Sequence, residues 1–222
     1  MKQKGIIFDM DGLMFDTERL GYDRVFGVVE KFGYTMLNNI LDKTIGVNKK
    51  TAIEIFKNYF GEDFPAEEIL IEKRRLVNEY LEKNGVPIKP GLLELLDYLD
   101  KYKIKKVVAT SSYRKVAENI LKKAGVYDRF DDIVCGDEVQ KSKPEPDIFL
   151  KALEKLNLSV DEVIILEDSR MGILAAHRAN IKSIMVPDIL PADEETQKLY
   201  YAECKSLLEV KNLLIKQRLI YN

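Results

Sequence analysis

The sequence contains few of the residues that build a disulfide framework or a zinc site. It has two cysteines and one histidine among 222 residues. Cys135 and Cys204 are far apart and lack the spacing of metal ligands, so we expect free, buried thiols in a reducing cytosol. His177 belongs to no recognisable motif, and we expect it to be structural or exposed.

The chain also lacks a charge excess and a long apolar run. Its 35 basic and 37 acidic side chains give a net charge of -2, which offers no electrostatic reason to expect nucleic acid or an anionic membrane as a partner. No segment reaches the length of a transmembrane helix, and the apolar run before Asp9 is too short for the core of a signal peptide. We therefore expect a cytoplasmic globular protein, with no membrane association and monomeric by default.

Two regions of the chain differ in their apolar periodicity. Residues 17–87 carry apolar side chains at helical spacing and few strand signals, which predicts a small helical bundle. From residue 88 onward, short apolar runs alternate with helical segments. Such alternation is typical of a parallel sheet covered by helices on both faces. The sequence thus predicts an α/β core with a Rossmann-like parallel sheet, formed by residues 1–16 and 88–222, and an inserted helical domain at 17–87.

The expected elements of the core follow from the same patterns. A first strand begins at residue 6, and further strands are expected at residues 106–110, 132–135, 163–166 and 183–186. Helices are expected at residues 92–99, 116–124, 146–156, 171–179 and 206–219.

The first strand ends in two carboxylates, Asp9 and Asp11, which are followed at once by Gly12. Residues two apart on a strand point the same way, so both carboxylates would project together where the strand stops. Two neighbouring buried carboxylates suggest a metal, a shared proton, or a nucleophile beside its acid/base partner. The simpler alternative is a turn in which the aspartates only cap the following loop.

Polar side chains also follow other strands of the predicted sheet. In open parallel sheets, ligands bind at the carboxyl ends of the strands. Thr110 and Ser111 follow the second strand, where hydroxyl and backbone N–H groups at a helix start suit a phosphate. Lys143 precedes the fourth strand and would add a positive charge for the same anion.

Glu167 and Asp168 follow the fourth strand, and together with Asp9 they could hold a hard divalent cation such as Mg²⁺. Taken singly, each of these polar groups is explained as well by helix capping or by a solvated loop charge. Taken together at one edge of a sheet, they favour phosphoryl transfer to a carboxylate, because that reaction needs cations to neutralise two anions.

Four short segments, in this order, resemble the motifs of the haloacid dehalogenase superfamily: Asp9-Met10-Asp11-Gly12, Thr110-Ser111, Lys143-Pro144 and Glu167-Asp168-Ser169. The resemblance spans the whole chain. The helical insert looks like the C1-type cap of the branch that contains β-phosphoglucomutases and phosphoglycolate phosphatases. The resemblance implies a sheet order of 5-4-1-2-3, a Mg²⁺ cofactor and a small phosphorylated metabolite as substrate.

The resemblance also implies roles for the matching residues. Asp9 would be the nucleophile that forms an aspartyl-phosphate, and Asp11 the general acid/base. Mg²⁺ would be held by Asp9, the backbone carbonyl of Asp11 and Asp168, with Glu167 in the same acidic cluster. The phosphoryl oxygens would be bound by Thr110, Ser111 and Lys143. The second aspartate and the acid pair argue against carbon–halogen hydrolysis, because the dehalogenases of the superfamily lack these acids.

The cap departs from the mutase pattern at three positions. β-Phosphoglucomutases carry a histidine where this chain has Gly21, and a lysine and an arginine where it has Ile45 and Lys49. Isoleucine cannot hydrogen-bond a sugar, and lysine cannot reproduce the bidentate grip of arginine. We therefore predict a phosphatase acting on a small phosphorylated metabolite such as a sugar phosphate. A phosphosugar mutase is the alternative, and a catalytically silent binding or regulatory protein on the same fold is an alternative of another class.

Two further expectations concern substrate recognition and motion. Lys49, Lys50 and Arg114 are candidate substrate contacts, with solvated surface charges as the alternative for each. We also expect the cap to move on the core through two hinges, at Asp16-Thr17 and at residues 85–91, which would admit substrate and then exclude bulk water.

Overall fold

The computed structural model describes residues 2–220. Its sheet has the strand order β3-β2-β1-β4-β5-β6, and the strands pair in parallel. The strands are β1 (Gly5–Phe8), β2 (Lys105–Thr110), β3 (Asp132–Cys135), β4 (Val163–Glu167), β5 (Lys182–Met185) and β6 (Ala202–Glu203). The predicted fold class and the order of the first five strands are confirmed. The two-residue β6 was not predicted, because it has no apolar run that would mark it as a strand.

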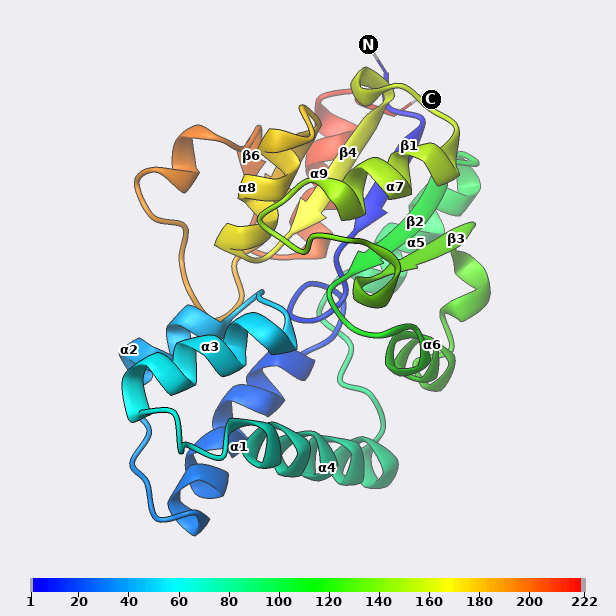
Figure 1. Cartoon of the computed structure of the whole chain (residues 1–222). Coiled ribbons are helices and arrows are strands. Elements are labelled where there is room, and N and C mark those ends of the chain that lie inside the picture. Colours follow the sequence, from blue (N-terminus) through cyan, green and yellow to red (C-terminus); the bar gives the residue numbers. More distant parts are fainter. Residues whose placement is uncertain (1, 221–222) are drawn as a thin grey trace.

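Helices cover both faces of the sheet (Figure 1). They are α5 (Leu92–Lys101), α6 (Arg114–Lys123), α7 (Asp147–Leu156), α8 (Arg170–Arg178) and α9 (Leu207–Lys216). Alternate residues of β1 point to opposite faces. Ile6 and Phe8 belong to the apolar cluster that includes α5, α6 and α9, whereas Ile7 belongs to the cluster that includes α7 and α8. The continuous apolar strands are therefore explained by burial on both sides.

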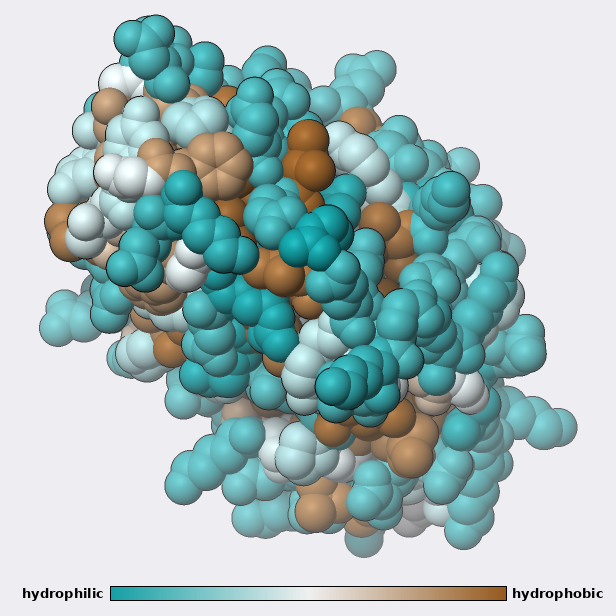
Figure 2. Space-filling view, turned by 90° about the horizontal axis from the view of Figure 1, so that it is seen from below, coloured by the Kyte–Doolittle hydropathy of each residue, from teal (hydrophilic) through white to brown (hydrophobic). Residues whose placement is uncertain are grey.

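The helices between Thr17 and Asn84 form a separate unit, called the cap below, at the lower end of the molecule in Figure 1. They are α1 (Thr17–Lys31), α2 (Asn38–Leu41), α3 (Lys49–Phe60) and α4 (Ala66–Asn84). Their apolar stripes meet in a cluster of their own, which includes Val25, Val29, Phe56 and Ile69. Seen from the cap end, the surface is mostly hydrophilic, with small scattered hydrophobic areas (Figure 2).

The two linkers that join the cap to the core lie side by side. The backbone N–H of Asp16 donates to the carbonyl of Pro87, and that of Lys89 donates to the carbonyl of Met14, both at 2.9 Å. Phe15 and Ile88 form an antiparallel bridge between these two bonds. Chain entry and chain exit of the cap are therefore tied together at one place on the core.

Other expectations from the sequence concern single residues and the membrane. Cys135 and Cys204 are free and buried, as predicted. His177 is exposed on α8. Within residues 2–220 no helix is both long and apolar enough to cross a membrane.

Candidate active site

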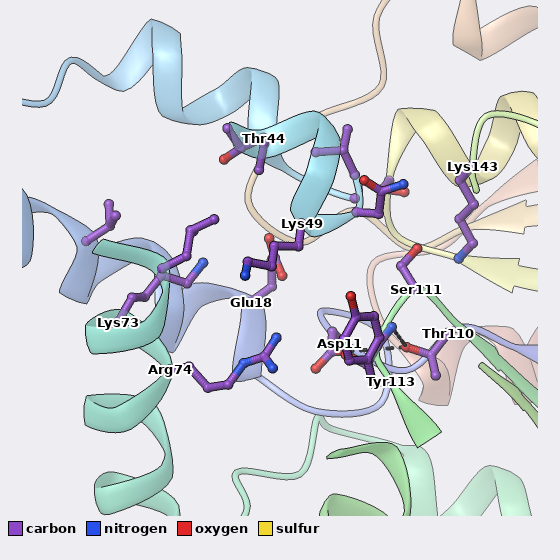
Figure 3. A pocket seen from close by; sticks show the side chains of 18 of the residues that line it. Asp11, Glu18, Thr44, Lys49, Lys73, Arg74, Thr110, Ser111, Tyr113 and Lys143 are labelled. Atoms are coloured by element: carbon purple, nitrogen blue, oxygen red, sulfur yellow. Dashed lines mark hydrogen bonds between the residues drawn. The ribbon is translucent and has the colours of Figure 1, made fainter. Parts of the chain in front are cut away.

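A cavity of about 270 Å³ lies between the cap and the carboxyl ends of the strands. Most of the predicted site residues line it: Asp9, Asp11, Lys49, Thr110, Ser111, Lys143 and Asp168. Figure 3 shows residues of the core on one side of the cavity and residues of α1, α3 and α4 on the other. Three predicted residues, Glu167, Arg114 and the exposed Lys50, do not line it.

Parallel pairing brings the core residues together. Phe8 of β1 lies level with Val108 of β2 and with Leu166 of β4, so these three strands end at the same edge of the sheet. The backbone N–H of Asp9 donates to the carbonyl of Leu166 at 3.0 Å, which extends this pairing to the first residue after the strand. Motifs that are far apart in sequence therefore converge on one edge.

Lys143 lies between two buried carboxylates. Its Nζ donates to Oδ1 of Asp9 and, at 2.5 Å, to Oε1 of Glu167. Burial alone would lower the pKa of Lys143, but the two carboxylates outweigh it and raise that pKa above its ordinary value. The lysine therefore stays protonated and fixes the orientation of the Asp9 carboxylate.

Glu167 uses both of its oxygens inside the protein. Oε1 accepts from Lys143, while Oε2 accepts from the backbone N–H groups of Asp168 and Ser169 and from the Ser169 hydroxyl, each at 3.0 Å. Glu167 thus belongs to the acidic cluster, as expected, but neither oxygen is directed to the cavity. The structure corrects the predicted set of metal ligands in this respect, because Glu167 supports the lysine and the start of α8.

The remaining carboxylates of the cluster are short of positive charge. Burial, with Glu167 and Asp11 nearby, raises the pKa of Asp9 to about 8 despite the attraction of Lys143. Burial and the charges of Glu167 and Asp9 raise the pKa of Asp168 well above its usual range. One lysine cannot balance this many carboxylates, so a further cation is needed to keep them ionised.

The donor atoms at this place fit a hard cation such as Mg²⁺. Asp9 and Asp168 line the cavity, and all the available donors are oxygens, which Mg²⁺ prefers. Gly12 has a φ of +88°, and a Cβ there would lie 2.2 Å from Oδ2 of Asp168, so only glycine lets that carboxylate approach the turn. Among residues 2–220, no group of three His, Cys, Asp or Glu side chains is placed to hold a metal ion. A cation here would therefore also need backbone, water or substrate oxygens, which is the usual way that Mg²⁺ is bound.

Hydroxyl groups hold the second aspartate. Oδ1 of Asp11 accepts from Thr17 Oγ1 at 2.5 Å, and Oδ2 accepts from Ser112 Oγ at 2.8 Å and from Thr110 Oγ1 at 3.4 Å. Thr17 is the first residue of the cap helix α1, so one of these bonds joins the acid to the cap. Ser111 points into the cavity beside Lys143 (Figure 3). Thr17 and Ser112 are site residues that the motif comparison missed.

Arg114 is not a substrate contact in this structure, contrary to the prediction. Its guanidinium donates to the carbonyl of Ile133 at 2.6 Å and, through Nε, to Glu138 at 2.8 Å. These bonds hold the side chain along β3 and away from the cavity. Lys49 does line the cavity, where it also pairs with Glu67 at 3.2 Å.

The cap contributes charged side chains that carry no motif. Glu18, Lys73 and Arg74 line the cavity (Figure 3). Burial, with Asp11 and Asp188 nearby, raises the pKa of Glu18, while Lys73 opposes that rise. The guanidinium of Arg74 lies 5.9 Å from the centre of the Tyr113 ring, which belongs to the core. No sequence signal distinguishes these residues from a solvated helix face.

Lys73 covers the position at which the mutases carry histidine. A Cβ on Gly21 would lie 2.9 Å from Cε and 3.1 Å from Nζ of Lys73. The lysine therefore lies across α1 in space that a side chain at residue 21 would need. A side chain at residue 21 would therefore have to displace the flexible end of Lys73.

The cap also contacts the core beside the cavity. Asn48 Nδ2 donates to Ser142 Oγ at 2.5 Å, and Lys123 of the core pairs with Glu82 of the cap. With the Arg74–Tyr113 contact, these interactions connect the cap to the core.

Comparison with known proteins identifies the family. A family model described as haloacid dehalogenase-like hydrolase matches residues 6–186. The chain belongs to this family. Among curated members, the phosphorylated carbohydrates phosphatase of Thermotoga maritima is 32% identical over 186 residues, which cover 82% of this chain and 83% of that protein.

Solved structures agree with the family assignment at the level of the fold. The crystal structure of β-phosphoglucomutase from Clostridium difficile has a TM-score of 0.81 and 24% identity, and the match covers 98% of this chain and 97% of that one. The structure of CbbY from Rhodobacter sphaeroides in complex with phosphate has a TM-score of 0.80 and 24% identity, with 94% and 96% covered. The resemblance to the haloacid dehalogenase superfamily is thus confirmed, and both solved structures share the fold of this chain.

Proposed function

We propose that this protein is a Mg²⁺-dependent phosphatase that hydrolyses a small phosphorylated metabolite through an aspartyl-phosphate on Asp9. The observation that carries the proposal is the position of Asp9 at the end of β1. Its carboxylate is buried, bonded to Lys143, and in contact with a cavity that Asp11 and Asp168 also line. This is the arrangement that a carboxylate needs to attack a phosphoryl group, which is itself an anion.

Asp9 and Asp11 divide the reaction between them. A carboxylate oxygen of Asp9 attacks phosphorus, the bond from phosphorus to the ester oxygen breaks, and Asp11 gives its proton to that leaving oxygen. In the second half, Asp11 takes a proton from water, the water oxygen attacks phosphorus, and inorganic phosphate leaves with Asp9 restored. The three hydroxyls around Asp11 hold it in place for both transfers.

The cations serve the same charge problem. Lys143 keeps the Asp9 carboxylate oriented and partly neutralised, and Glu167 holds the lysine. Mg²⁺, when bound, would be held by the carboxylates of Asp9 and Asp168 and by the backbone carbonyl of Asp11. It would supply positive charge to offset the negative charges of the attacking carboxylate and the phosphoryl oxygens. Ser111 would bind phosphoryl oxygens, whereas the Thr110 hydroxyl, expected from the sequence to do the same, donates to Asp11 and accepts from the backbone N–H of Ser112.

The cap would select the substrate. The cavity presents Lys49, Lys73 and Arg74 opposite the carboxylates, beside apolar side chains such as Phe56. A volume of about 270 Å³ suits a small metabolite, and the lining cations suit one whose remaining groups are polar or anionic. The name of the Thermotoga relative supports a phosphorylated carbohydrate as the substrate class.

The test is phosphate release from a panel of sugar phosphates and an aryl phosphate, with and without Mg²⁺. We expect turnover only with the metal, and we expect Asp9→Asn to lower it at least about a thousandfold. Asp128→Asn, an exposed residue of the core, serves as the matched control and should leave turnover unchanged. Undiminished turnover in Asp9→Asn would refute the nucleophile assignment, and no turnover across the panel would favour a silent binding protein.

The mutase alternative has its own assay. With β-glucose 1-phosphate and a bisphosphate primer, we expect free phosphate to accumulate. The contact of Lys73 with Gly21 speaks against a histidine-type catalyst at that place. Accumulation of glucose 6-phosphate without free phosphate would reverse this ranking.

A further inference from the structure

Asp188 lies in the loop after β5, outside all four motifs. Only 2% of its side chain is exposed. Oδ1 accepts from Nζ of Lys89 at 2.5 Å, and Nη2 of Arg19 lies 3.7 Å from the same oxygen. Lys89 belongs to the second linker of the cap, and Arg19 follows the first. One oxygen of Asp188 thus contacts the second linker and the first turn of α1.

These contacts do not account for the burial of the other carboxylate oxygen of Asp188. Oδ2 is buried and has no hydrogen-bond partner among the described residues. It lies 3.3 Å from the point that a Cβ on Gly12 would occupy, and Oδ2 of Asp168 lies 2.2 Å from that same point. Oδ2 of Asp188 and Oδ2 of Asp168 are therefore at most 5.5 Å apart. A buried carboxylate oxygen without a partner is costly, so this atom calls for a water or a cation nearby.

We propose that Asp188 is a further acid of the metal site, which helps to hold Mg²⁺ through a bound water instead of ligating it directly. The proposal rests on the Mg²⁺ site of the proposed function, to which it adds a residue. Carboxylates that lie behind the direct ligands orient them and add negative charge, and their loss typically weakens metal binding 10- to 100-fold. The pairing of Asp188 with Lys89 uses Oδ1 and leaves Oδ2 free for the metal side.

The placement has a consequence for the cap. One oxygen of the same carboxylate lies near Gly12 and Asp168, and the other accepts from Lys89 of the second linker. Asp188 is therefore a positioning residue that connects metal occupancy to the geometry of the cap linkers.

The experiment is calorimetric titration of the full chain with MgCl₂ alone, without substrate. We expect Asp188→Asn to raise the Kd for Mg²⁺ about tenfold. Asp16→Asn is the matched control, because it makes the same chemical change at another partner of Lys89. Oδ1 of Asp16 lies 3.5 Å from Nζ of Lys89, and 37% of the Asp16 side chain is exposed. We expect its Kd to equal that of the wild type. Thermal melts of each variant by circular dichroism establish that it is folded.

Lys89→Met separates the metal role from damage to the linkers, because it removes the linker partner and leaves the Asp188 carboxylate in place. We expect its Kd to be unchanged or lower. A wild-type Kd in Asp188→Asn, or an equal loss of affinity in Asp188→Asn and Lys89→Met, would overturn the proposal. Asp168→Asn tests the underlying site. If it binds Mg²⁺ as tightly as the wild type, the metal site of the proposed function is wrong, and the role of Asp188 falls with it.

Discussion

The core and the cap face the same cavity but hold their charged groups in different ways. In the core, Asp9, Lys143 and Glu167 are buried and bonded to one another. In the cap, Lys73 is partly exposed and Arg74 is exposed, and each reaches the cavity from the end of a long side chain. A rigid, buried network is suited to one chemical step, whereas flexible cations can be exchanged without disturbing the fold. The difference suggests that chemistry resides in the core and substrate choice in the cap.

The largest expected effect is the loss of Lys143. Lys143→Met leaves Asp9 and Glu167 as neighbouring buried carboxylates without their cation. We expect the free energy of unfolding to fall by about 3–5 kcal/mol and turnover to be lost with it. Chemical denaturation and phosphate release measure the two effects. Lys115→Met, which removes an exposed lysine of α6, should change neither; a stable, active Lys143→Met variant would show that the core network is not what organises the site.

The next effect concerns Asp11. Asp11→Asn keeps the shape of the side chain but cannot transfer a proton, so we expect kcat to fall by about 10²- to 10⁴-fold on a sugar phosphate. The fall in the rate of the first half-reaction should be smaller on an aryl phosphate, whose leaving oxygen needs less protonation. Single-turnover rates on both substrates measure this. Equal losses for the two leaving groups in that step would contradict the role of general acid.

The cap should respond differently. Arg74→Met removes a cation of the cavity that lies outside the Asp9–Lys143–Glu167 network of the core, so we expect kcat/KM for a sugar phosphate to fall about tenfold with stability unchanged. Activity on a small aryl phosphate should be retained. Lys50→Met, an exposed lysine of α3 that does not line the cavity, is the control. A similar loss on both substrates would show that Arg74 serves the chemistry and would weaken the division between core and cap.

The smallest expected effect is at Gly21, where two glycines of α1 form a matched pair. Alanine is favoured over glycine inside a helix by about 0.8–1.0 kcal/mol, so Gly27→Ala, which has open space around it, should stabilise the protein without changing activity. Gly21→Ala must also displace the flexible end of Lys73. We expect a smaller gain in stability and a few-fold lower kcat/KM for sugar phosphates. Thermal melts and steady-state kinetics compare the two; identical behaviour would remove Lys73 from substrate recognition.

The sequence predicts the core better than the cap for a physical reason. Strands buried on both faces are continuous apolar runs, and acids or hydroxyls at their ends are conspicuous. Asp9, Thr110 and Asp168 can therefore be assigned to one edge of a sheet from the sequence alone. The strand β6 offers no such run. Glu167 was assigned to the correct cluster, but only the hydrogen bonds show that its oxygens serve Lys143 and the start of α8.

The cap residues could not be read in this way. Lys73 and Arg74 precede Arg75, which pairs with Glu72 and Glu79 of its own helix instead of lining the cavity. Nothing in the sequence separates Arg75 from the two residues that line it. Arg114 was a candidate substrate contact, yet Glu138 and the carbonyl of Ile133 hold it elsewhere. Side-chain direction at a helix start depends on tertiary partners, which sequence spacing does not specify.

The central claim is that the phosphoryl group passes through Asp9. Rapid acid quench of the reaction with a radiolabelled aryl phosphate and Mg²⁺ measures this most directly, with Asp11→Asn used to slow the second half-reaction. We predict a label on the peptide that contains Asp9, removable by hydroxylamine, and absent in Asp9→Asn. The account would be contradicted if Asp11→Asn turned over the substrate but carried no label on Asp9. It would also be contradicted if Asp9→Asn still became labelled.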